Sequence, residues 1–118
     1  MSTPYSKDVK LDPGTFGSSP ACHVLVDMMN NNFISIGDKH KVLSFVDDAN
    51  IQMKWISTIA YKPAMSRSLA LFREDLLARV NQMPYEEKFK THLKNVISYF
   101  YKKTLRAWNE SKLDNRKK

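Results

Sequence analysis

Apolar residues recur at steps of three and four along most of the chain, which is the spacing of one face of an α-helix. Four such runs are separated by helix-breaking segments, such as the pair Met83 and Pro84. The runs predict helices over residues 20–32, 39–61, 64–82 and 84–111. We therefore expect an all-α protein, a compact bundle of about four helices.

The expected helices carry recognisable local signals. Ser19 offers a hydroxyl to the free backbone amides of the first helix, and Pro20 fits its first turn. The second helix has six small or apolar residues along one face, at Val42, Val46, Ala49, Met53, Ile56 and Ala60. These signals support the helical interpretation of both segments.

A short β-hairpin near residues 33–46 is the alternative. Residues 33–36 and 42–45 form two short apolar runs joined by a stretch that contains a glycine. In this alternative Asp47 or Asp48 caps a shorter helix, and the fold class becomes α+β.

The first 19 residues differ in composition from the rest of the chain. They contain two prolines and two glycines with few large apolar side chains, so burial cannot compensate for the entropy lost on ordering. We expect a disordered N-terminal arm over 1–19, a helical domain over 20–112 and a basic C-terminal tail over 113–118.

The surplus of positive charge is confined to the end of the chain. The sequence has 19 Lys and Arg against 12 Asp and Glu, a net charge of +7. Residues 88–118 hold ten basic residues and only two acidic ones, whereas residues 1–87 hold nine basic and ten acidic residues. A basic face concentrated in one element attracts phosphate, whereas evenly spread charge mainly aids solubility.

The fourth predicted helix separates its core residues from its charges at about 100 degrees per residue. Its core side collects Phe89, Leu93, Val96, Ile97, Phe100, Thr104 and Trp108. Its opposite side collects Lys88, His92, Asn95, Tyr99, Lys102, Lys103 and Arg106. A flank adds Lys90, Lys94, Tyr101 and Lys112. No Asp or Glu stands between Lys88 and Asn109 to balance these cations.

This pattern favours nucleic acid, RNA or DNA, as the ligand over a merely solvated helix face, which would normally carry acids among its lysines. Cations at this spacing can follow successive phosphates, and Tyr99 can stack on a base or a sugar. The candidate nucleic-acid-binding residues are Lys88, Lys90, Lys94, Tyr99, Lys102, Lys103, Arg106, Lys112, Arg116, Lys117 and Lys118.

A protein-interaction or oligomerisation module is the rival hypothesis. Apolar residues that lie off the core faces of the second and fourth helices form two strips that another chain can cover. The candidate contact residues are Trp55, Ile59, Tyr101 and Leu105. The partner would be an acidic protein surface that docks on the basic helix, within a larger assembly, or a second copy in a homodimer.

The residues that would indicate catalysis are scattered. Cys22 and His23 are adjacent, so their side chains point about 100 degrees apart on a helix and do not form a nucleophile and base pair. A buried structural role suits Cys22 better. The three histidines lack metal-ligand spacing, and no glycine-rich phosphate loop occurs. We expect a non-enzymatic protein with no catalytic residue, metal or cofactor.

The chain lacks the segments that would direct it to a membrane or a secretory route. It has no run of about 18 apolar residues, and its first 19 residues lack an apolar signal core. Its one cysteine cannot form an internal disulfide, which suits a reducing compartment. We expect an intracellular protein, cytoplasmic or nuclear, with no membrane contact.

Overall fold

The computed structural model describes residues 10–31 and 33–117, with the side chains of 10–31 and 33–111. The described chain contains no strand, and its helices are α1 (Pro20–Asn30), α2 (Ile36–Ile56), α3 (Lys62–Asn81) and α4 (Glu87–Lys117). The predicted all-α bundle is confirmed. The hairpin alternative is wrong, because residues 36–56 form one continuous helix.

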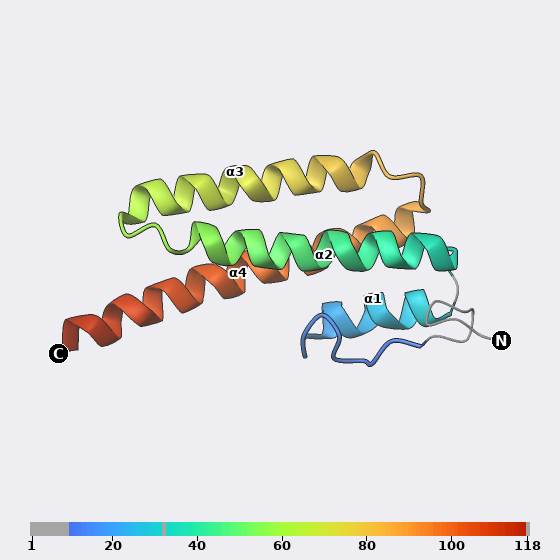
Figure 1. Cartoon of the computed structure of the whole chain (residues 1–118), viewed down its shortest axis with the longest axis horizontal. Coiled ribbons are helices and arrows are strands. Elements are labelled where there is room, and N and C mark those ends of the chain that lie inside the picture. Colours follow the sequence, from blue (N-terminus) through green and yellow to red (C-terminus); the bar gives the residue numbers. More distant parts are fainter. Residues whose placement is uncertain (1–9, 32, 118) are drawn as a thin grey trace.

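Successive helices run in opposite directions, and α4 is the central element (Figure 1). It packs against α1, α2 and α3, and α2 and α3 also pack against each other. The short helix α1 covers only the N-terminal half of α4, whose C-terminal half continues past the start of α1 (Figure 1). One long helix therefore has a surrounded half and a half that is covered less.

The core consists of apolar side chains from all four helices at the spacing that the sequence predicted. In α2 the buried face runs from Val42 to Met53, and Ala60 lies beyond the helix and is exposed. In α4 the buried apolar residues are Phe89, Leu93, Val96, Ile97 and Phe100. Methionines fill much of the remaining space, since Met29, Met53 and Met65 have no exposed surface.

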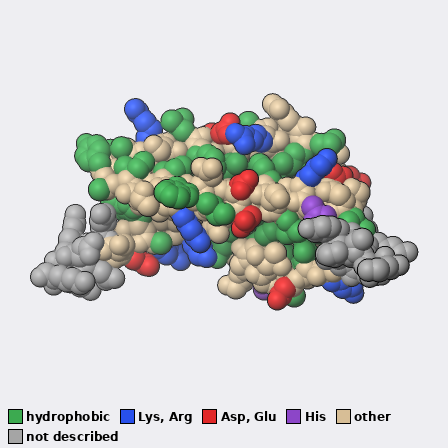
Figure 2. Space-filling view, viewed as in Figure 1, with side chains coloured by type: hydrophobic (Ala, Val, Ile, Leu, Met, Phe, Trp, Pro, Cys, Tyr) green, Lys and Arg blue, Asp and Glu red, His purple; other side chains and the backbone are tan. Residues whose placement is uncertain are grey.

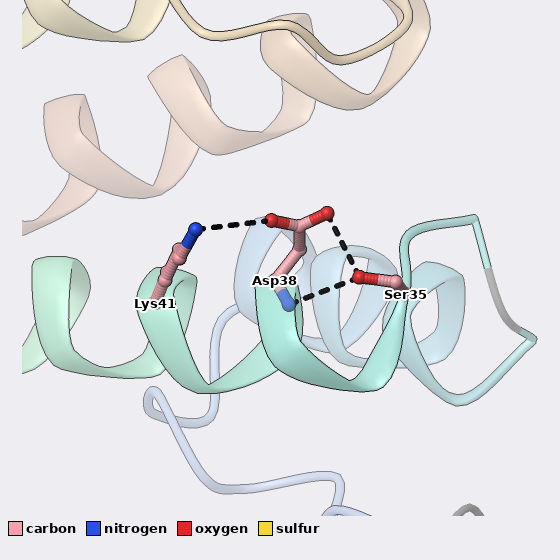
Figure 3. A network of polar contacts seen from close by, with 3 residues as sticks. All are labelled: Ser35, Asp38 and Lys41. Atoms are coloured by element: carbon pink, nitrogen blue, oxygen red, sulfur yellow. Dashed lines mark hydrogen bonds and ion pairs between the residues drawn. The ribbon is translucent and has the colours of Figure 1, made fainter.

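Two serines begin the first two helices. Ser19 Oγ accepts a hydrogen bond from the Cys22 amide, as the sequence predicted. Ser35 Oγ accepts from the Asp38 amide at 3.1 Å and donates to Asp38 Oδ2 at 2.9 Å, while Lys41 Nζ lies 3.9 Å from the other carboxylate oxygen (Figure 3). This reciprocal cap fixes the start of α2 at Ile36.

The cap of α2 is also linked to the connection between α3 and α4. Burial, followed by the charge of Asp38 and a hydrogen bond to it, raises the pKa of Tyr85 above its ordinary value. Pro84 lies in this connection and not in the first helical turn, because α4 begins at Glu87. The sharp turn predicted between the two helices is therefore slightly longer than expected.

Helix α2 ends earlier than its apolar spacing predicted. The hydroxyls of Ser57 and Thr58 donate to the carbonyl oxygens of Lys54 and Trp55, at 2.6 and 2.7 Å. These local bonds satisfy terminal carbonyls and replace further helical turns. Ile59 consequently lies in the connection to α3.

Residues 10–19, which were expected to belong to a disordered arm, pack on the helices. Phe16 is buried in the core, and the backbone of Leu11 exchanges two hydrogen bonds with the Asn30 side chain at 2.8 and 3.1 Å. Composition alone did not reveal this, because a single aromatic residue and one side-chain amide provide the attachment. The remainder of the expected arm, residues 1–9, lies outside the described residues.

None of the described helices combines the length and apolar character that crossing a bilayer requires.

Candidate nucleic-acid interface

The predicted cations of α4 fall into separate groups along the helix. Lys102, Lys103 and Arg106 are exposed and lie within about one turn, and we call them the basic cluster. Lys88 is also exposed, but 14 residues separate it from Lys102, which is about 21 Å along the helix axis. Its Nζ lies 5.8 Å from the centroid of the Phe33 ring. Lys88 therefore stands apart from the basic cluster.

The basic cluster forms no ion pair with any described residue. The four ion pairs within the described part of the chain are Lys41 with Asp38, Arg73 with Glu74, Arg79 with Asp75, and Lys90 with Glu87. Figure 2 shows basic side chains gathered at the lower left, where Figure 1 places the C-terminal half of α4. Glu110 lies one turn after Arg106 but forms no ion pair with the basic cluster, so positive charge predominates in this region.

One of the predicted phosphate contacts, Lys90, does not belong to this surface. Lys90 is buried, with 7% of its surface exposed, and its Nζ lies 2.8 Å from Glu87 Oε1 and 3.3 Å from the carbonyl oxygen of Asn81. Its hydrogen bond and its charge, with a smaller contribution from Lys94, lower the pKa of the Glu87 carboxyl. The prediction that Lys90 stands uncompensated is wrong, because Glu87 lies just before the acid-free stretch and forms an ion pair with Lys90 one turn along the helix.

Tyr99 lies at the edge of the basic cluster and is half-buried. Its ring packs beside Gly17, where φ is 130° and a Cβ would lie 3.5 Å from Tyr99 Cε2. Lys103 Nζ lies 5.9 Å from the centroid of the same ring. One part of the Tyr99 ring therefore packs against the protein itself, which reduces the ring surface on which a base could stack.

Three of the four predicted partner contacts pack within the chain itself. Ile59, Tyr101 and Leu105 are half-buried against the core, and Arg73 Cζ lies 4.3 Å from the centroid of the Tyr101 ring. They therefore form a less exposed strip than expected, because each already packs against the core of its own chain. Trp55 is different, since 69% of its surface is exposed.

Sequence reasoning missed two features next to these residues. Ile51, one helical turn before Trp55, is 43% exposed, so α2 presents an apolar pair. Lys54 lies close to α4 across a pocket that is also lined by Lys103 and Trp108. The spacing of Ile51 and Trp55 was a usable signal, whereas the approach of Lys54 to α4 depends on tertiary packing.

Three further predictions concern the C-terminal cations, Cys22 and metal binding. The side chains of Lys112, Arg116, Lys117 and Lys118 lie outside the described residues. Cys22 is buried, and its Sγ lies 3.1 Å from Ser19 Oγ and 3.4 Å from the Phe16 carbonyl oxygen, which fits the expected structural role. Among the described residues, no group of three His, Cys, Asp or Glu side chains could hold a metal ion.

Comparisons with known protein families, with curated proteins and with solved structures find no match to this chain. Its interpretation therefore rests on the geometry of its own residues.

Proposed function

We propose that this protein is a non-enzymatic binding module for nucleic acid, RNA or DNA, which contacts phosphates through the basic cluster of α4. The observation that carries the proposal is that Lys102, Lys103 and Arg106 are exposed and form no ion pair with a described residue. Three exposed cations that form no ion pair with a described residue favour a polyanion at this position.

The dimensions of the basic cluster suit a short piece of a nucleic-acid strand. Its residues span about 6 Å of helix axis. Phosphates of one strand rise by about 3.4 Å per nucleotide, so the cluster can contact two or three successive phosphates. Contacts of this kind fix the position of the strand without reading its sequence. Such a module would act inside the cell, in the cytoplasm or the nucleus.

The proposal is tested by measuring the affinity for short single-stranded RNA and DNA at several salt concentrations. The logarithm of the association constant should fall linearly with the logarithm of salt concentration. Replacing the basic cluster by glutamine (Lys102→Gln, Lys103→Gln and Arg106→Gln together) should reduce the magnitude of that slope by about 2, at about 0.7 per lost contact.

A matched control removes the same charge elsewhere. Lys41→Gln, Arg67→Gln and Arg79→Gln together take three positive charges from α2 and α3 and leave α4 unchanged. This variant should retain most of the wild-type salt slope. Equal losses in the two triple variants would show that only net charge matters, and the proposal would then be wrong. Absence of binding at low salt would also reject it.

The second candidate function is protein interaction or oligomerisation through α2. It is favoured by the exposure of Trp55 and of Ile51, which lie one helical turn apart. A second copy would bury this pair in a homodimer, whereas an acidic partner would dock on the basic helix. Sedimentation of the wild type should then exceed the monomer mass of 13.7 kDa, and Trp55→Gln should restore the monomer. A strictly monomeric wild type would exclude the homodimer.

A further inference from the structure

A pocket of about 280 Å³ lies between the C-terminal part of α2 and the C-terminal half of α4. Asn50, Lys54, Ser57 and Thr58 line it from the α2 side, together with Ile59. Lys103, Thr104, Ala107, Trp108 and Ser111 line it from α4. It adjoins the basic cluster, because Lys103 belongs to both. Its volume lies just below the usual range for ligand sites, about 300 to 1,000 Å³, so it suits one small ligand.

The charge of this pocket is positive on both sides. Lys54 and Lys103 line it from different helices, its lining includes no Asp or Glu, and neither lysine forms an ion pair with a described residue. A neighbouring cavity of about 310 Å³ shares Asn50 but includes Asp47, which would repel an anion. Phosphate is therefore favoured in the first pocket and not in the second.

The α4 side of the pocket supplies an aromatic surface. Trp108 is half-buried, and its Nε1 donates to the carbonyl oxygen of Ile59 at 3.1 Å, a bond that holds the indole in a fixed orientation. Fixed aromatic rings are the surfaces on which unpaired bases stack. Because Ser57 and Thr58 hydroxyls already donate to backbone carbonyls, their oxygens remain able to accept hydrogen bonds from a sugar or a base.

We infer that this pocket holds one unpaired nucleotide of the bound strand, with a phosphate between Lys54 and Lys103 and the base or sugar against Trp108. The inference rests on the proposed function and makes it more specific. A base that is paired within a duplex could not enter the pocket, so the protein selects single-stranded over double-stranded nucleic acid.

The tryptophans provide a direct measurement, because the chain has only Trp55 and Trp108. In the full-length Trp55→Phe variant, Trp108 is the single tryptophan. Stacking should quench its fluorescence when a short single strand is added, and the matching duplex should quench it much less at the same concentration. In the reciprocal Trp108→Phe variant, the strand should leave the remaining Trp55 signal nearly unchanged, because Trp55 does not line the pocket.

A lysine pair tests the phosphate contact separately from the base. Lys54→Gln should reduce the magnitude of the salt slope by about 0.7, the loss of one contact, and weaken the quenching of Trp108. Lys41→Gln removes the same charge from the same helix outside the pocket and should leave both quantities near wild type. Both lysines are exposed, and circular dichroism confirms that each variant keeps its helices.

The outcomes distinguish the inference from the proposed function. If the strand binds without quenching Trp108, and Lys54→Gln behaves like Lys41→Gln, the pocket is not the nucleotide site and the proposed function stands without it. If a 5′-mononucleotide quenches Trp108 but no strand binds, the pocket is a nucleotide site and the proposed function is wrong. Equal quenching by single strand and duplex would overturn the selection of unpaired bases.

Discussion

The two halves of α4 differ in what surrounds them. Up to Phe100 the helix carries six buried residues, including Lys90, because α1, α3 and residues 10–19 enclose it. From residue 101 to 111 no side chain is buried, and the basic cluster and the pocket wall lie there. The same helix therefore supports the fold with its first half and presents the candidate binding surface with its second.

This division has a physical origin in the length of α1. Helix α1 has 11 residues and α4 has 31, so α1 cannot cover the whole of its neighbour. In the second half of α4, Lys103 and Ala107 are both exposed. Cations in that region stay in contact with water, so they carry little desolvation cost. The buried Lys90 instead needs polar partners to offset the removal of its charge from water.

The largest expected effect comes from shortening a core residue in the first half. Leu93 has no exposed surface, so Leu93→Ala should lower the free energy of unfolding by about 2 to 5 kcal/mol through lost burial and a residual cavity. Urea denaturation followed by circular dichroism measures this change.

The matched variant in the second half should cost less. Leu105 is half-buried, so Leu105→Ala should lower the free energy of unfolding by only about 1 kcal/mol. Equal losses of unfolding free energy in the two alanine variants would contradict the difference between the two halves, since the second half would then contribute to the core as strongly as the first.

An effect smaller than that of Leu93→Ala tests whether residues 10–19 pack against the first half of α4. Gly17 has a φ of 130°, which residues with a Cβ rarely adopt, and it packs beside Tyr99. Gly17→Ala should therefore lower the free energy of unfolding by about 1 to 3 kcal/mol. Gly14→Ala is the control, because Gly14 is not described with a positive φ and an added Cβ would lie 4.0 Å from Asp12 Oδ1, an ordinary van der Waals distance. Equal and negligible losses of unfolding free energy in the two variants would show that residues 10–19 do not pack stably on the helices.

The helicity of the second half can be measured at Ala107, an exposed position inside α4. Ala107→Gly should cost about 1 kcal/mol of helix propensity and little else, because no side-chain burial is lost. If the second half unfolds together with the core, urea denaturation will report this loss. If it frays separately, helical content will fall while the denaturation midpoint stays constant, and the two halves would differ in stability as well as in burial.

The sequence predicted most of the fold because helix formation here depends on local patterns. Steps of three and four gave the four helices, and the position of Ser19 gave the start of α1 to the residue. The end of α2 was misplaced, since Ile56 and Ala60 keep the apolar spacing while the Ser57 and Thr58 hydroxyls end the helix. Hydrophobic spacing does not record such competing hydrogen bonds.

The candidate site was less predictable because burial depends on how many neighbours an element has. The angular positions of Lys102 and Arg106 on the helix predicted that both point away from the core, and both are exposed. Tyr101 and Leu105 are less exposed than predicted because their packing against the core, such as that of Tyr101 against Arg73 of α3, is a tertiary property. The pocket between Lys54 and Lys103 joins residues 49 positions apart, which no local pattern could reveal.

The smallest expected effect concerns the one acidic residue that compensates the first half of α4. The pKa of Glu87 is lowered by its hydrogen bond to Lys90, by the charge of Lys90 and, to a lesser extent, by Lys94. A carboxyl with a lowered pKa in the folded state stabilises the protein above its ordinary pKa, and this contribution disappears as the pH falls through the folded-state value. The wild type should therefore be more stable than Glu87→Gln near neutral pH, and the difference should vanish at acid pH, where Glu87 is protonated in the folded state as well. Thermal unfolding at both pH values measures this difference, with Glu86→Gln as the control because Glu86 forms no ion pair with a described residue.

A difference between wild type and Glu87→Gln that is independent of pH would mean that Glu87 acts through packing, and the contrast between a compensated first half and an uncompensated second half of α4 would be lost.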